Sequence, residues 1–136
     1  MKIALFGTNF SENFNKYIQH LINKLEAENV KIYVEQFFYN YLEDRLRFKN
    51  DVFIFTNHDD LKNKADVLFS IGGDGTLLNA VSYVRDSNIP ILGINTGRLG
   101  FLATIQKEKI TESLHQILEG TNEIMRVIIS RHLKNN

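Results

Sequence analysis

The sequence contains no cysteine, and it has no excess of charge of either sign. Without cysteine, disulfides and thiolate metal sites are excluded, and the composition is compatible with a reducing cytoplasm. Lysine plus arginine and aspartate plus glutamate both number 16, so the formal net charge is zero and nothing favours nucleic acid as a partner. A hydrophobic content of 43% with 24% charged residues is that of an ordinary globular protein.

The sequence also lacks a long hydrophobic run. The apolar run near the N-terminus, residues 3–6, is too short for a signal peptide or a membrane span. A length of 136 residues leaves room for one domain. We therefore expect a cytoplasmic protein with one domain and no membrane partner.

The first 35 residues have the apolar pattern of a strand, then of a helix, then of a second strand. Residues 3–6 are an unbroken apolar run ended by Gly7, which is typical of a strand buried on both faces. Residues 14–25 have helical spacing, and residues 30–35 alternate between apolar and polar. A strand, a helix and a strand predict a right-handed βαβ unit with parallel strands. The first turn has only one glycine, so the usual Gly-x-Gly-x-x-Gly dinucleotide fingerprint is absent.

The pattern is less regular between residues 36 and 60. Aromatic residues crowd residues 36–50 without a clean period, and we expect them in core or helix packing rather than in a stacking platform for a ligand. Residues 52–55 predict a short strand, and residues 57–60 predict a turn. His58 lies beside two carboxylates, but neighbours in a turn rarely converge on one ion, so we favour no metal site there. The other histidines, expected at the surface, are His20, His115 and His132.

The most informative stretch is Gly-Gly-Asp-Gly-Thr at residues 72–76. It follows an apolar run at residues 67–71 and precedes Leu77, Leu78, Val81 and Val84, whose spacing predicts one face of a helix. The glycines thus lie where a buried strand turns into a helix, the edge at which open α/β sheets bind ligands. The free N–H groups of that helix end favour anions. Two interpretations of this stretch are open. Asp74 or Thr76 could simply cap the helix, or the carboxylate of Asp74 could be a base or a metal-facing group beside a phosphate.

A second ligand-facing segment is predicted at the end of the next strand. Pro90 opens an apolar run at residues 91–94, and proline is tolerated at the start of a strand. The segment at residues 93–102, Gly-Ile-Asn-Thr-Gly-Arg-Leu-Gly-Phe-Leu, then lies on the same sheet edge as Asp74. Two such loops on one edge are the geometry that a nucleotide site requires. Residues 110–118 predict a further helix, which Gly120 ends.

These two motifs resemble those of a known enzyme family. Residues 72–76 resemble the signature of a kinase superfamily that includes NAD kinases, lipid kinases and, more distantly, phosphofructokinases. Residues 93–102 resemble the Gly-x-Asn-x-Gly-x-Leu-Gly-Phe-Leu segment of NAD kinases, and lipid kinases differ here. The resemblance implies an α/β fold, a Rossmann-like open parallel sheet with flanking helices, for a nucleotide-binding domain at residues 1–120. In this family a β-rich C-terminal domain follows, and residues 121–136 are expected to be its start or a tail.

The resemblance to NAD kinases also implies a reaction. The γ-phosphoryl group of ATP, accompanied by Mg²⁺, passes to the 2′-hydroxyl of the adenosine ribose of NAD, which gives NADP. Asp74 is implied as the catalytic base and Gly75 as a backbone contact to the same nucleotide. Phe101 either packs against the adenine or fills space beneath the loop, and Asn79 is a further implied contact, where many relatives have a basic residue. The remaining loop residues, with no protein metal ligand among them, are Gly72, Gly73, Thr76, Asn95 and Gly97.

Two alternatives to an active NAD kinase remain. One is another kinase of the superfamily, such as a lipid kinase, which the segment at residues 99–102 argues against. The other is a truncated chain that binds a nucleotide without catalysis. Asn122-Glu123 matches a substrate-binding pair of the family, but that pair lies further downstream in relatives, so we interpret the match as coincidence. We expect the full-length protein to form a homo-oligomer and the isolated chain to be inactive; the choice of ATP or polyphosphate, and of NAD or NADH, stays open.

Overall fold

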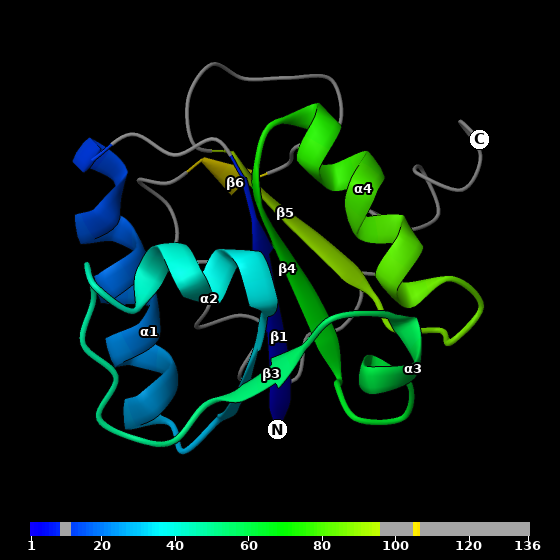
Figure 1. Cartoon of the computed structure of the whole chain (residues 1–136), viewed down its shortest axis with the longest axis horizontal. Helices are drawn as coiled ribbons and strands as arrows, with labels where there is room; N and C mark the ends of the chain where they lie inside the picture. The colour runs from blue at the N-terminus through cyan, green and yellow to red at the C-terminus, as the bar shows by residue number, and fades with distance from the viewer. Residues whose placement is uncertain (9–11, 96–104, 107–136) are drawn as a thin grey trace.

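The computed structural model describes residues 1–8, 12–95 and 105–106 (Figure 1). Within this part of the chain, six strands form one parallel sheet in the order β3-β2-β1-β4-β5-β6. The strands are β1 (Lys2–Gly7), β2 (Lys31–Glu35), β3 (Phe53–Phe55), β4 (Val67–Gly72), β5 (Ile91–Asn95) and β6 (Ile105–Gln106). The helices are η1 (Glu12–Phe14, a 3₁₀ turn), α1 (Asn15–Ala27), α2 (Gln36–Leu42), α3 (His58–Leu61) and α4 (Asp74–Val84).

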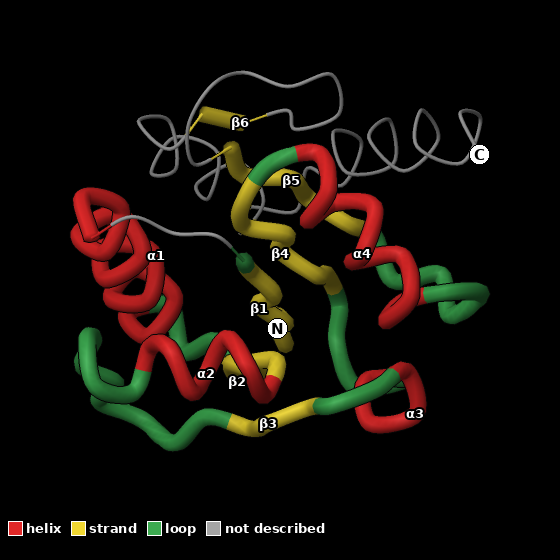
Figure 2. The backbone as a smooth tube through the Cα atoms, turned by 45° about the horizontal axis from the view of Figure 1, so that its top comes forward, coloured by secondary structure: helices red, strands yellow, loops and turns green. Residues whose placement is uncertain are grey.

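Helices cover both faces of the sheet (Figure 2). Because successive side chains of a strand point to opposite faces, β1 contributes to two cores. Ile3 and Leu5 pack in the core beneath α1 and α2, whereas Ala4 and Phe6 pack in the core beneath α3 and α4. This is the environment that the unbroken apolar run of residues 3–6 predicts. The α/β class with a parallel sheet and flanking helices is confirmed.

The order of the strands reverses at β1. From β1 the chain adds β2 and β3 on one side, and then crosses to add β4 and β5 on the other side. Ligands of open α/β sheets bind at such a reversal, beyond the carboxyl ends of the strands. Gly7 pairs with Ile71, and Gly72 pairs with Asn95, so the ends of β1, β4 and β5 lie side by side.

Several local predictions are confirmed. The predicted first helix is α1, which buries Ile18, Leu21, Ile22 and Leu25. The short strand at residues 52–55 is β3, and the alternating segment at residues 30–35 is β2. The aromatic segment falls mostly on α2, where Phe38 is fully buried but Phe37 is 80% exposed. No helix in the described part of the chain is long and apolar enough to cross a membrane.

Two local predictions are wrong. Residues 57–60 are not a turn: Asn57 caps the short helix α3, and its side-chain oxygen accepts a hydrogen bond from the N–H of Asp60 at 3.0 Å. Asparagine favours both turns and N-caps, and the buried Leu61 decides for the helix here. On α4, Leu78 is 48% exposed, because the buried face runs instead through Thr76, Leu77, Ala80 and Val84. The helix predicted at residues 110–118, and Gly120, lie outside the described residues.

Candidate active site

The turn from β4 to α4 holds the Gly-Gly-Asp-Gly-Thr motif. β4 ends at Gly72, Gly73 adopts extended backbone at the N-cap position, and α4 begins at Asp74. Neither Asp74 nor Thr76 therefore occupies the N-cap position, where asparagine, aspartate, serine or threonine would be expected to cap the helix. Gly73 has no side chain with which to cap the first turn, so the positive end of α4 is not covered from that position. The predicted strand-to-helix turn is confirmed.

The glycines of this turn are present for different reasons. Gly72 has a φ of +157°, and a Cβ there would lie 2.4 Å from the Oγ1 of Thr76, so the fold itself requires glycine. A Cβ at Gly73 or Gly75 would meet no atom within 4 Å. Nothing in the described part of the chain therefore requires glycine at these two positions. Their lack of side chains leaves the backbone on both sides of the partly exposed Asp74 open to close approach from outside.

Thr76 joins this turn to the end of β1. Its side chain is only 4% exposed, and its Oγ1 lies 2.5 Å from the Oγ1 of Thr8, the first residue after β1. The N–H of Thr8 also donates to the carbonyl oxygen of Ile71 at 3.3 Å. Neither sequence motif includes Thr8, although its place after the first buried strand is a position from which ligand-facing residues often come.

The second motif begins on the strand that the sequence predicts. β5 ends at Asn95, whose backbone is in register with Gly72, so Asn95 lies at the same edge of the sheet as Asp74. Gly97 and Phe101 lie outside the described residues. Asn79 is exposed on the second turn of α4, and four positions after Gly75 it lies on the same side of the helix as that glycine.

The usual ribose-binding position of a dinucleotide fold is used differently here. In such folds a carboxylate at the end of the second strand bonds the ribose hydroxyl. Here that residue is Glu35, which is 2% exposed, and its two oxygens accept hydrogen bonds from the N–H groups of Phe37 (2.9 Å) and Phe38 (3.0 Å). Glu35 therefore caps α2 instead of facing a ligand. Burial, and secondarily the charge of Glu35, raise the pKa of the nearby Tyr83 phenol above its ordinary value.

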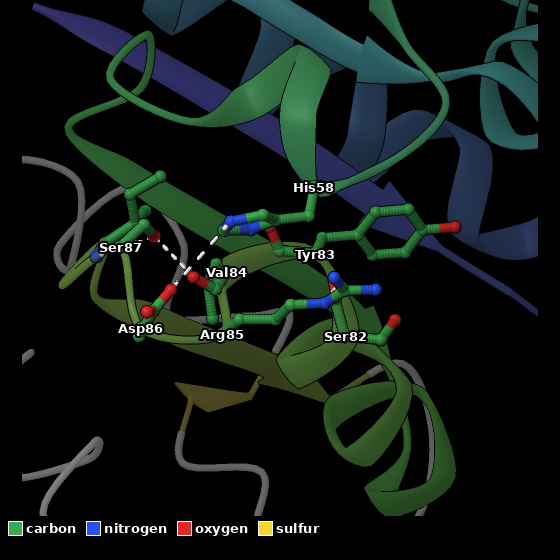
Figure 3. A network of polar contacts seen from close by, with 8 residues as sticks. His58, Ser82, Tyr83, Val84, Arg85, Asp86 and Ser87 are labelled. Atoms are coloured by element: carbon green, nitrogen blue, oxygen red, sulfur yellow. Dashed lines mark hydrogen bonds and ion pairs between the residues drawn. The ribbon is translucent and has the colours of Figure 1, made fainter.

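His58 lies beside the C-terminal end of α4, whereas the motif lies at the beginning of that helix (Figure 3). It is 8% exposed, its Nδ1 lies 3.0 Å from the carbonyl oxygen of Tyr83, and its Nε2 lies 4.0 Å from a carboxylate oxygen of Asp86. It thus joins α3 to the C-terminal end of α4, where helix carbonyls need partners. Among the described residues, no group of three or more histidine, aspartate or glutamate side chains is placed to hold a metal ion. His20 is exposed, as predicted; His115 and His132 lie outside the described part.

The sequence of this chain matches a known protein family over most of its length. A family model described as the ATP-NAD kinase N-terminal domain matches residues 4–122. The chain belongs to the NAD kinase family. The NAD kinase of Christiangramia forsetii is 42% identical to it over 119 residues, which cover 88% of this chain and 40% of that protein. The NAD kinase of Bacteroides fragilis is 35% identical over 145 aligned residues, which cover 100% of this chain and 48% of that protein.

The similarity covers only part of the length of these relatives and extends to a solved structure. The chain spans less than half the length of these NAD kinases. Among solved structures, yeast NADH kinase complexed with NADH superposes with a TM-score of 0.72 at 20% identity, and the match covers 88% of this chain and 38% of that one. At this identity the superposition shows a shared fold. The resemblance inferred from the two motifs is confirmed, and the lipid-kinase alternative is not favoured.

Proposed function

We propose that this chain is the part of an NAD kinase that carries the catalytic carboxylate. The whole protein then transfers the γ-phosphoryl group of ATP to the 2′-hydroxyl of the adenosine ribose of NAD, which gives NADP. The observation that carries the proposal is the setting of Asp74. It begins an eleven-residue helix at the reversal point of the sheet, between two glycines that the fold itself does not require.

In this proposal Asp74 accepts the proton of the attacking ribose hydroxyl. The positive end of α4 favours the ionised carboxylate, which is the form that a base needs. Gly73 and Gly75 allow the nucleotide to come into contact with the backbone on both sides of the carboxylate. The N–H groups of the first turn of α4 are suited to phosphate oxygens. Phosphoryl transfer depends mainly on such positioning and charge neutralisation, and little covalent chemistry is needed from the protein.

The turn does not offer a protein cage for the magnesium ion that accompanies ATP. Asp74 is the only carboxylate of residues 72–76, and no group of three or more acidic or histidine side chains in the described part of the chain is placed to hold a metal ion. In this proposal Mg²⁺ keeps several waters and is held largely by the phosphate oxygens of ATP, so it needs no protein carboxylate from this turn as a ligand. Bound in this way, it would neutralise the charge of the triphosphate. Asp74 would then remain available as the base.

Further contacts and partners belong to the same proposal. We propose that Asn79, on the side of α4 that bears Gly75, contacts the substrate, and that Asn95, Gly97 and Phe101 complete the nucleotide-binding edge. We further propose residues 1–120 as the nucleotide-binding domain, residues 121–136 as the start of a second domain or a tail, and a homo-oligomeric whole protein that uses ATP with Mg²⁺.

A chimeric enzyme tests the proposal. Residues 1–122 of this chain replace the matching part of the Christiangramia forsetii NAD kinase, and NADP formation is measured with NAD, ATP and Mg²⁺. We expect turnover by the chimera and its loss in the matched variant Asp74→Asn, which preserves the shape of the side chain but cannot act as a base. A folded chimera that makes no NADP, while the parent kinase does so in the same assay, would contradict the proposal.

A further inference from the structure

Two threonine hydroxyls connect the ends of the two central strands. The Oγ1 of Thr8, just after β1, and the Oγ1 of Thr76, in the first turn of α4, lie 2.5 Å apart. The two residues are 68 positions apart in the sequence. The N–H of Thr8 also donates to the carbonyl oxygen of Ile71 in β4 at 3.3 Å. Thr8 is therefore attached to the end of β4 through its backbone and to the following turn through its side chain.

We propose that Thr8 is a positioning residue that holds the Asp74 turn in place through Thr76. This inference rests on the proposed function insofar as it takes Asp74 as the base. Thr8 itself does not touch the reacting atoms in this proposal. Its role is to fix where β4 ends and where α4 begins, and Asp74 is the first residue of that helix.

The packing of Thr76 explains why one hydroxyl pair can fix the turn. Thr76 is 4% exposed, and its Oγ1 and Cβ lie 2.4 Å and 2.8 Å from the point that a Cβ of Gly72 would occupy. Its side chain therefore lies directly against the backbone of Gly72, in the space that a side chain there would fill. A shift of Thr76 necessarily moves the backbone between Gly72 and Thr76, which includes Asp74.

Thr76 differs from the other residues of the turn in the burial of its side chain. Gly73 and Gly75 have no side chains, and Asp74 is partly exposed at the mouth of the turn. Thr76 is thus the buried side chain of residues 72–76, and Thr8 is its partner on β1. Because a misplacement of about 1 Å can cost a hundredfold in rate, a bond that fixes this backbone bears directly on turnover.

The first test uses the 136-residue chain itself. The N–H of Leu77 donates to the carbonyl oxygen of Gly73 at 3.1 Å, so its hydrogen exchange reports on the first turn of α4. In Thr8→Val, which keeps the shape of the side chain but not its hydroxyl, we expect exchange at Leu77 to be about fivefold faster or more. Exchange at Ile22, in the middle of α1, should not change. Thr8→Ser, which retains the hydroxyl, should restore the original rate.

A matched control separates this effect from the general cost of losing a threonine hydroxyl. Thr56 donates from its Oγ1 to Asp60 at 2.7 Å, remote from the turn, and Thr56→Val should leave exchange at Leu77 unchanged. Equal exchange at Leu77 in Thr8→Val and the original chain would overturn the proposal. An equal rise at Leu77 and Ile22 would also overturn it, because Thr8 would then stabilise the fold as a whole.

The second test measures turnover in the chimeric enzyme. Thr8→Val should lower kcat about tenfold or more with the KM for NAD within about twofold, and Thr8→Ser should restore kcat. In an Asp74→Asn background, Thr8→Val should change the remaining kcat by less than about twofold, because its effect passes through that carboxylate. The same fall in both backgrounds would overturn the proposal. An inactive chimera would count against the kinase function instead, and the exchange at Leu77 would still decide the role of Thr8.

Discussion

A side chain added at Gly75 is expected to stabilise the fold and to weaken function. A Cβ there meets no atom within 4 Å, and Gly75 is not among the described residues with positive φ. It lies in the first turn of α4, and glycine in a helix is less favourable than alanine by up to about 1 kcal/mol. Gly75→Ala also reduces the freedom of the unfolded chain. We therefore expect this substitution to stabilise the fold by about 0.5–1 kcal/mol.

The same added carbon is expected to weaken function, because it projects into the space that the nucleotide is proposed to enter. Gly75→Val places two further methyl groups there. We expect it to lower kcat/KM for NAD in the chimeric enzyme by about tenfold or more, which corresponds to about 1.4 kcal/mol of lost transition-state binding. Gly75→Ala should give a smaller loss in the same direction.

Thermal unfolding of the 136-residue chain, followed by circular dichroism, provides the stability measurement. Gly75→Ala should raise Tm by about 2–5 °C. The matched control Gly72→Ala should lower Tm, since its Cβ would lie 2.4 Å from the Oγ1 of Thr76 and the cost of such backbone strain is about 1–3 kcal/mol. A raised Tm with full kcat/KM for NAD in both Gly75 variants would refute the role of the glycine in ligand approach. A lowered Tm in Gly75→Ala would refute the expectation that a Cβ at this position meets no other atom.

Three further predictions concern the carboxylates and the extent of the chain. Asp74→Asn in the chimeric enzyme should lower kcat about a hundredfold or more while the affinity for NAD changes much less, and near-normal turnover would leave Asp74 with a structural role only. A polypeptide of residues 1–136 alone should form no measurable NADP, bind NAD weakly by calorimetry and self-associate in sizing experiments. The reason is that the described motif residues lie on one sheet edge and approach a substrate from one side. Robust turnover by a monomer would contradict this prediction and return Asn122-Glu123 to the site. Glu35→Ala should lower the free energy of unfolding by about 1–2 kcal/mol, the usual cost of a lost helix cap, without changing nucleotide affinity; weaker NAD binding at unchanged stability would assign Glu35 to the ribose after all.

The site could be predicted from the sequence where its residues are adjacent in the chain. The apolar run before residue 72 and the helical spacing after residue 76 predict the strand-to-helix turn, and Pro90 predicts the start of β5 to within one residue. The motif around Asp74 therefore needs only local sequence to be located on the fold.

Other features depend on contacts between distant residues, and the sequence does not predict them. Thr8 is missed because its partner Thr76 is 68 positions away. Glu35 alternates with apolar neighbours as an exposed strand residue would, yet it is buried because the following helix supplies two N–H donors. Leu78 follows Leu77 directly, and only the packing of α4 on the sheet decides which of the two is buried.

The central place of β1 in the sheet has a consequence for synthesis of the chain. Ile3 pairs with Ile32 on one side and with Val67 on the other, which is 67 − 3 = 64 positions later. At about 5–20 residues per second, β4 emerges from the ribosome roughly 3–13 seconds after β1. Throughout that interval the second edge of β1, built of Ile3, Ala4, Leu5 and Phe6, has no native partner, and an unpaired apolar edge is a template for wrong pairing. The nascent chain is therefore most vulnerable before β4 is made, and the connection between Thr8 and Thr76 cannot form until β4 and the start of α4 have been made.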